Sequence, residues 1–184
     1  MNNKIVKLSV ILFLVCAITA GVLGVVNELT YKRIEAINIE KTTVAYKTVL
    51  PEADSFSEVD ISAIKETHPT VYYLCKANNG AGYVVESSFT GAQGAIVMAV
   101  GVGADFKCTG IAIIAHSETS GLGANAASTA KVGVDFRAQF VGQGEDVALA
   151  KAGGEIDALS GATITSRSVT NAVAESIKAV KEVA

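Results

Sequence analysis

The sequence predicts an α+β protein, in which an N-terminal transmembrane helix is followed by a domain with an antiparallel sheet flanked by helices. Three observations predict this class. Residues 8–26 form an uncharged run in which 15 of 19 residues are apolar. Residues 71–118 alternate strand-like apolar runs with turn residues. The last twenty or so residues repeat apolar side chains at helical spacing.

The run at residues 8–26 has the length of a transmembrane helix, because 19 helical residues span about 28 Å, close to the hydrocarbon thickness of a bilayer. A cleaved signal peptide is the alternative. The run is longer than a usual signal-peptide core, however, and it shows no clear small-x-small cleavage site. We therefore predict a retained anchor over residues 1–27, with membrane lipid as a partner.

The charges around this run predict its orientation. Lys4 and Lys7 precede it, whereas the basic residues that follow it are offset by nearby glutamates. This bias favours a cytoplasmic N-terminus and a domain on the periplasmic side of the inner (plasma) membrane, reached by a single pass. Residues 27–184 carry 13 basic against 18 acidic residues. Such a domain would repel phosphate backbones, so no nucleic-acid partner is expected.

Residues 28–70 are predicted to connect the anchor to the domain. Spaced apolar residues among charged ones indicate a helical stalk that ends at Leu50-Pro51. The segment from residue 52 to residue 70 is mixed and acidic, and Pro69 ends it. The folded domain is then predicted over residues 71–184.

This domain begins with four predicted strands. Residues 71–77 and 82–89 flank Asn78-Asn79-Gly80, a turn signal that favours a hairpin. Two further runs, residues 95–102 and 108–118, are separated by a second turn signal that starts at Gly103. Strands that follow one another across short turns predict an antiparallel meander.

The remainder of the domain is predicted to be mainly helical. A short helix and turn are expected over residues 128–140. A final helix is indicated by apolar residues at helical spacing, namely Val169, Val173, Ile177 and Val180. Ser166 or Thr165 is available as its N-cap.

The cysteines and histidines do not form a metal motif. Cys16 lies in the anchor, while Cys75 and Cys108 would both face an oxidising space, which leaves a disulfide between them open. Each lies in an apolar strand-like run, which is also typical of a buried free thiol. His68 and His116 are far apart in sequence, and no CxxC is present, so neither a zinc nor an iron–sulfur site is expected.

Two polar, Gly-rich segments carry the candidate chemistry. Residues 118–123 (ETSGLG) leave the last predicted strand, and residues 157–166 (DALSGATITS) directly precede the final helix. The second segment has four hydroxyls, at Ser160, Thr163, Thr165 and Ser166. Free backbone N–H groups and the positive end of the helix dipole favour a phosphate there. The alternative is that these hydroxyls only cap the helix.

The motif D-x-x-S-G-A-T at residues 157–163 resembles the flavinylation motif of the FMN-binding domain family. Residues 118–123 are similar to the second signature of that family, which lies by the flavin. The resemblance covers residues 71–184, and the single anchor agrees with it. Ser120 is a departure, because many relatives have proline there. The family includes the G subunit of the Rnf electron-transport complex and the C subunit of the sodium-pumping NADH:quinone oxidoreductase.

The resemblance implies a covalent FMN, attached through its phosphate to Thr163 by a dedicated flavin transferase, since the motif ends at Thr163. Thr165 is the rival acceptor. Further cofactor contacts are expected from Ser160, Gly161, Ala162, Thr165, Glu118, Thr119, Leu122 and Gly123. Among these, the small residues would let the ribityl chain approach the backbone. Leu122 would form an apolar wall beside the isoalloxazine ring. Glu118 and Thr119 would form hydrogen bonds with the ring or with the ribityl hydroxyls. Asp157 is expected to position a metal or the loop during transfer.

The resemblance further implies a membrane-anchored flavoprotein subunit that relays electrons in an Rnf-type ion-translocating ferredoxin:NAD oxidoreductase complex. Its partners would be the other membrane subunits, and it would have no independent substrate site, because the chemistry is that of the cofactor. The alternatives are the C subunit of a sodium-translocating NADH:quinone oxidoreductase and a non-redox anchored ligand-binding module. A Ser or Thr hydrolase is not expected, since no suitably placed His–Asp pair is recognisable.

Overall fold

The computed structural model describes residues 2–184. These residues divide into two compact units, with the boundary after Lys41. Helix α1 (Asn2–Val49) supplies the whole first unit and ends two residues before Pro51, as predicted. The sequence predicts three segments, an anchor, a connecting region and a domain, with boundaries at residues 27 and 70. This division by role stays a prediction. The compactness boundary falls inside α1, because the last two turns of this helix pack on the sheet of the second unit.

One stretch of the described residues has the length and composition to cross a membrane. It covers Lys4–Tyr31 of α1, with a mean hydropathy of 2.7, and the rest of the described chain buries none of it. The predicted anchor is therefore present as a continuous apolar helix.

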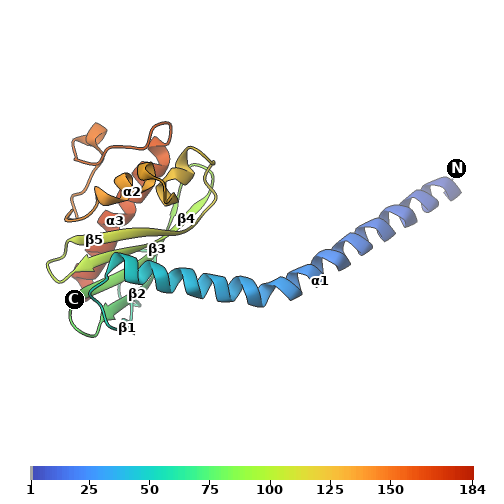
Figure 1. The fold of residues 1–184 in the computed structure, drawn as a ribbon. Helices are drawn as coiled ribbons and strands as arrows, with labels where there is room; N and C mark the ends of the chain where they lie inside the picture. Colours follow the sequence, from blue (N-terminus) through green and yellow to red (C-terminus); the bar gives the residue numbers. More distant parts are fainter. Residues whose placement is uncertain (1) are drawn as a thin grey trace. The chain divides into compact units, whose positions relative to one another are not determined.

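The second unit is built on a five-stranded antiparallel sheet in the order β1-β2-β3-β4-β5 (Figure 1). The strands are β1 (Phe56–Glu58), β2 (Val71–Ala77), β3 (Gly82–Thr90), β4 (Ala95–Gly103) and β5 (Cys108–His116). The predicted meander is confirmed for β2 to β5. Strand β1 was not predicted. It has only three residues, and pairing with the edge of β2, rather than a pattern of its own, makes it a strand.

The helical elements that follow the sheet are η1 (Gly123–Ala127), α2 (Lys131–Ala138), η2 (Ala150–Ala152) and α3 (Thr163–Val183). The expected short helix and the final helix are thus confirmed. The predicted N-cap of the final helix is wrong, because α3 begins at Thr163 with Ala162 as N-cap. Ser166 lies in the first turn instead. Its Oγ accepts a hydrogen bond from the Leu159 N–H at 2.9 Å and donates one to the Ala162 carbonyl at 2.9 Å.

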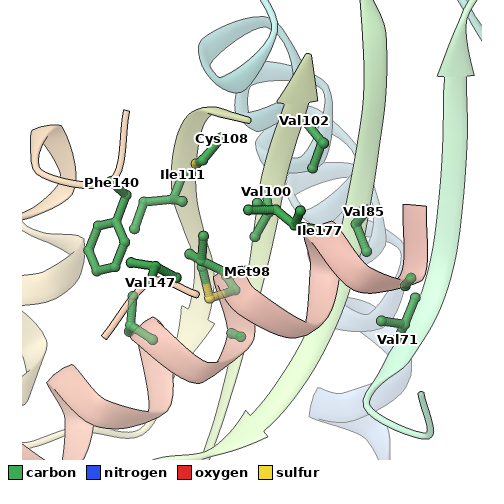
Figure 2. Packing of buried hydrophobic residues seen from close by; sticks show 14 of the residues in the cluster. Val71, Val85, Met98, Val100, Val102, Cys108, Ile111, Phe140, Val147 and Ile177 are labelled. Carbon is green, nitrogen blue, oxygen red and sulfur yellow. The ribbon is translucent and has the colours of Figure 1, made fainter. Parts of the chain in front are cut away.

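Helices cover both faces of this sheet. On one face lies α3, whose Val169, Val173, Ile177 and Val180 are at most 1% exposed. Figure 2 shows Ile177 of α3 beside Val100 of β4, while Phe140 lies on the other side of Met98 in the same core. Burial of each such side chain stabilises the fold by about 1.5–3 kcal/mol. This face carries the main core and holds α3 in place.

On the opposite face, the last turns of α1 form a second apolar cluster with the sheet, in which Ala45 and Val49 pack on Val84 and Ala99. The carbonyl of Val49 accepts a hydrogen bond from the Thr109 hydroxyl at 2.5 Å. A Cβ at Gly101 would collide with that carbonyl, so this glycine leaves the space in which the end of α1 is seated.

The thiols of Cys75 and Cys108 are free, and both side chains are buried. Cys75 belongs to the cluster under α1, whereas Cys108 belongs to the core under α3. The two cysteines therefore lie on different faces of the sheet and do not pair. This answers the question that the sequence left open.

Candidate functional site

The two predicted motifs meet at the N-terminus of α3, where Glu118 contacts Thr165. Oε2 of Glu118 accepts a hydrogen bond from the Thr165 hydroxyl, and Oε1 accepts one from the backbone N–H of Gln93 at 3.0 Å. Glu118 is 8% exposed and Thr165 is 1% exposed. The contact therefore joins the end of β5, the β3–β4 turn and the first turn of α3 through one buried carboxylate.

The Glu118 carboxylate is ionised at neutral pH. Burial raises its pKa, but hydrogen bonds from the Thr165 hydroxyl and from the backbone N–H groups of Gln93 and Ala92 more than offset this, so the pKa lies below its ordinary value. An ionised carboxylate only accepts hydrogen bonds. Each of these contacts consequently has a fixed direction, with Glu118 as the acceptor.

Two glycines make room for this carboxylate. A Cβ on Gly123 would collide with Oε2 of Glu118 and would lie 2.6 Å from the Thr165 hydroxyl oxygen. A Cβ on Gly91 would collide with Oε1 of the same residue. Gly123 belongs to a predicted motif, whereas Gly91 was missed. Its only signal in the sequence is its place in a turn, which does not show what lies against it.

A cavity of about 350 Å³ opens beside this contact. It is lined by Ala92, Gln93, Glu118, Thr119, Leu122, Gly123, Gly161, Ala162, Thr163, Ile164 and Thr165. The structure thus brings eight of the nine predicted cofactor-binding residues to one cavity. The ninth, Ser160, is exposed and lines a neighbouring hollow of about 280 Å³ together with Asp157.

Exposed apolar side chains stand among the polar residues of this cavity. Leu122 is 44% exposed and Ile164 is 59% exposed. Gly161 has a φ of +71°, and a Cβ there would lie 3.0 Å from Cδ2 of Leu122. Only glycine adopts this backbone conformation without strain. Exposed apolar side chains beside a cavity are suited to a flat aromatic ligand. Ile164 was not identified from the sequence.

The first turn of α3 presents its backbone N–H groups without a side-chain cap, since Ala162 is the N-cap residue. These groups and the helix dipole favour an anion. Thr163 is partly exposed, and its hydroxyl makes no hydrogen bond to any other group within residues 2–184. The Thr165 hydroxyl, by contrast, is buried and donates to Glu118. Of these two threonines, Thr163 therefore has the accessible hydroxyl.

Thr163 also lines a third hollow, of about 210 Å³, together with Lys151, Arg167 and Asn171. Arg167 follows Thr163 by one helical turn, so the two side chains lie on the same side of α3. Both cationic residues are exposed. They were not predicted, because Lys151 lies outside both motifs and Arg167 resembles an ordinary surface residue of the helix.

The side chain of His116 and the backbone of Asp157 each have a structural partner. Nδ1 of His116 accepts a hydrogen bond from the Glu118 backbone N–H at 3.2 Å. Asp157 is exposed, and its backbone N–H donates to Oε1 of Gln139 at 2.7 Å. Within residues 2–184, no three His, Cys, Asp or Glu side chains gather in a way that could hold a metal ion.

Comparison with known proteins gives two family matches and several relatives of full length. A model described as the FMN-binding domain matches residues 91–178, and a model described as the RnfG N-terminal region matches residues 1–45. The first range contains both motifs and the cavity. The G subunit of the ion-translocating oxidoreductase complex of Methanosarcina acetivorans is 35% identical over 94% of this chain and 92% of its own length.

Two further relatives are named after the reaction of their complexes. The G subunit of the Na⁺-translocating ferredoxin:NAD⁺ oxidoreductase complex of Acetobacterium woodii is 34% identical over 94% of this chain and 89% of its own length. The G subunit of the proton-translocating ferredoxin:NAD⁺ oxidoreductase complex of Clostridium ljungdahlii is 30% identical over 97% of this chain and 93% of its own length.

Proposed function

Because this chain belongs to the FMN-binding domain family, as a G subunit of the Rnf-type ion-translocating oxidoreductase complexes, we propose that it relays electrons through an FMN attached covalently to Thr163. The protein is anchored by its N-terminal helix. It has no substrate site of its own in this proposal. FMN supplies the redox chemistry when bound, and the chain supplies attachment, orientation and surroundings.

The observation that carries the proposal is the difference between Thr163 and Thr165. Thr163 is partly exposed, lines all three hollows and has its hydroxyl free of hydrogen bonds to the described residues. Thr165 is 1% exposed and donates to Glu118. A phosphoester needs an accessible hydroxyl with space around it for the flavin, and Thr163 meets both conditions.

The surroundings of Thr163 suit a phosphate. Attachment forms a bond between Thr163 Oγ1 and phosphorus, and the hydroxyl proton departs with the leaving group that the flavin donor carries on that phosphorus. The uncapped N–H groups of α3 would bind the phosphate oxygens, and Lys151 and Arg167 would offset the remaining negative charge. The exposed side chains of Leu122 and Ile164 would cover an isoalloxazine ring in the larger cavity.

The relatives support a role for this chain in a complex. Those described above are all G subunits, which favours the Rnf-type assembly over the C subunit of a sodium-translocating NADH:quinone oxidoreductase. We infer that the other membrane subunits of such a ferredoxin:NAD oxidoreductase complex exchange electrons with this chain. A flavin transferase would act on it during maturation. The domain would lie on the periplasmic side, as the flanking charges predict.

Flavin that stays with the denatured polypeptide tests this function. The full chain is produced together with a flavin transferase, and a denaturing gel is inspected for flavin fluorescence. We expect a fluorescent band from the native sequence and from Thr163→Ser, and none from Thr163→Ala. Thr129→Ala, which removes an exposed threonine outside the cavity, is the matched control and should stay fluorescent. Absence of covalent flavin from the native sequence would contradict the proposal. Fluorescence in Thr163→Ala would show that the flavin is attached to another residue.

Orientation needs a separate measurement. Ser120 is exposed beside the cavity, whereas Cys75 and Cys108 are buried. In a Cys16→Ala background, Ser120→Cys should react with a membrane-impermeant maleimide added to spheroplasts. Labelling that requires permeabilised membranes would contradict the periplasmic placement.

A further inference from the structure

We propose that Glu118 is a positioning residue of the attachment site: its carboxylate ties the first turn of α3 to the β3–β4 turn and thereby fixes the direction in which Thr163 faces the cavity. The inference rests on Thr163 being the acceptor, as proposed above. It gives Glu118 a role different from the one expected from the sequence, which was a hydrogen bond to the flavin ring or the ribityl chain.

The Glu118 side chain is held in one direction by its partners. Both of its oxygens already accept hydrogen bonds from the protein, one from Thr165 and one from Gln93, and the residue is only 8% exposed. Its backbone N–H is bound to Nδ1 of His116, which holds the main chain at this point. Glu118 lines the cavity, but both of its carboxylate oxygens are already bound to the protein.

The contact with Thr165 also bears on the direction in which Thr163 faces. Successive residues of an α-helix are about 100° apart, so Thr165 points about 200° away from Thr163. Because Glu118 holds Thr165 against the interior, Thr163 must face outwards. The buried apolar face of α3 sets the rotation of the helix as a whole, but its first turn has no side-chain cap. The contact between Glu118 and Thr165 restrains this first turn.

A second contact holds the loop that leads into the helix. Ser166 bonds the Leu159 N–H and the Ala162 carbonyl, which fixes the residues that directly precede Thr163. The Glu118 contact and the Ser166 contact are made by adjacent residues of the first turn. Together the two contacts hold the backbone around Thr163, while the Thr163 hydroxyl stays free.

The close packing of two glycines shows that the carboxylate is held in a space built for it. Neither Gly91 nor Gly123 leaves room for a Cβ, and in both cases atoms of Glu118 stand in the way. Three separate segments of the chain are thus shaped around one side chain. Such a fit is expected of a residue that fixes geometry, because a reacting hydroxyl placed wrongly by a small distance attacks much more slowly.

The test measures the initial rate of flavin attachment on the purified full chain with a flavin transferase. It also measures hydrogen exchange, before attachment, of the hydrogen-bonded backbone amides at the start of α3, beginning with the Ser166 N–H, which donates to the Ala162 carbonyl at 2.9 Å. Thr165→Val removes the hydroxyl while keeping the shape, and we expect attachment about tenfold slower or worse together with faster amide exchange. Thr165→Ser keeps the hydroxyl and should restore most of the rate and of the protection.

Phe140→Leu is the control for general destabilisation, because Phe140 is fully buried in the core and does not line the cavity. Below its melting temperature this variant should attach flavin at the native rate. If Phe140→Leu slows attachment as much as Thr165→Val does, the rate reports overall stability and the proposal is overturned.

A double-mutant cycle with Glu118→Gln identifies the partner. The amide that replaces the carboxylate offers one acceptor atom in place of two, so the native contact is weakened in this variant. Thr165→Val should then slow flavin attachment by a smaller factor in the Glu118→Gln background than in the native one. Fully additive effects of the two substitutions would contradict the proposed pair. If Glu118→Gln does not fold, the comparison of Thr165→Val with Thr165→Ser decides alone.

The outcomes separate this inference from the proposed function. A native chain without covalent flavin would overturn the proposed function. A native chain with flavin, a Thr163→Ala variant without it, and a Thr165→Val variant with the native rate would leave the function standing and overturn the role of Glu118.

Discussion

The hydroxyl of Thr165 donates a hydrogen bond to Oε2 of Glu118, across 47 residues of sequence. This contact joins the two motifs at one cavity and removes Thr165 from the set of accessible hydroxyls. It therefore distinguishes two threonines that are only two positions apart in the sequence. The same contact makes Glu118 part of the support for the first turn of α3.

Substitution of Gly161 by alanine should disturb the cavity as well as the backbone. Its φ is +71°, and a Cβ would lie 3.0 Å from Cδ2 of Leu122. We expect Gly161→Ala to lower the free energy of unfolding by about 1–2 kcal/mol and to slow flavin attachment. Urea unfolding and the attachment assay measure the two effects.

Gly153→Ala is the matched control. Gly153 has a similar φ of +88°, and a Cβ there would meet nothing within 4 Å. Gly153→Ala should lower the free energy of unfolding by about as much as Gly161→Ala does and leave the rate of flavin attachment unchanged. Equal slowing in both variants would show that backbone strain, rather than the contact with Leu122, affects attachment.

The stability of the domain should fall as the pH drops below about 4.5, because the folded-state pKa of Glu118 is lower than its ordinary value. A group with a lowered folded-state pKa stabilises the fold above its unfolded-state pKa, and this stabilisation is lost as the pH falls through the folded-state pKa. Unfolding of the native chain should accordingly become easier from about pH 5 towards about pH 3.

Glu118→Gln should show a weaker decline over this pH range, since it no longer has the carboxyl at this position. Part of the decline should remain, because hydrogen bonds from Ser62 also lower the pKa of Asp60. The melting temperatures of both proteins, measured between about pH 3 and about pH 6, test this expectation. Identical pH profiles for the two would show that Glu118 is not the titrating group.

Phe140 should be among the residues on which stability depends most. It is fully buried and makes an edge-to-face contact with Phe136, at 5.3 Å between ring centroids. Phe140→Ala should lower the free energy of unfolding by about 3–5 kcal/mol. The adjacent Val141 is 57% exposed, so Val141→Ala should change it by less than about 0.5 kcal/mol. A loss under about 1 kcal/mol for Phe140→Ala would contradict the packing described above.

The thiols of the domain should be inert while it is folded. Burial raises the pKa of Cys75 to about 11 and that of Cys108 to about 12, so neither thiolate is present at neutral pH. In a Cys16→Ala background, a thiol reagent should label nothing in the folded chain and two cysteines per chain in denaturant. Rapid labelling of the folded protein would contradict the burial of these side chains.

Much of the fold could be predicted because it depends on local patterns. The apolar run of α1, the turn at Asn78-Asn79-Gly80 and the helical spacing around Val173 and Ile177 each lie within a short window of sequence. Strand β1 could not be predicted in this way, since its three residues form a strand only beside the edge of β2.

The candidate site could be predicted as a set of residues but not as a geometry. The anchor, the meander of β2 to β5 and the two motifs could be predicted, because periodicity, turn residues and short motifs are local properties of a chain. That Glu118 faces Thr165, that Gly91 makes room for it and that Thr163 is the accessible threonine became visible only in the folded domain. The physical reason is that a side chain takes its direction from its hydrogen-bond partners and its packing. For Glu118 these partners lie 25 and 47 residues away and meet it only when the sheet and α3 are packed together.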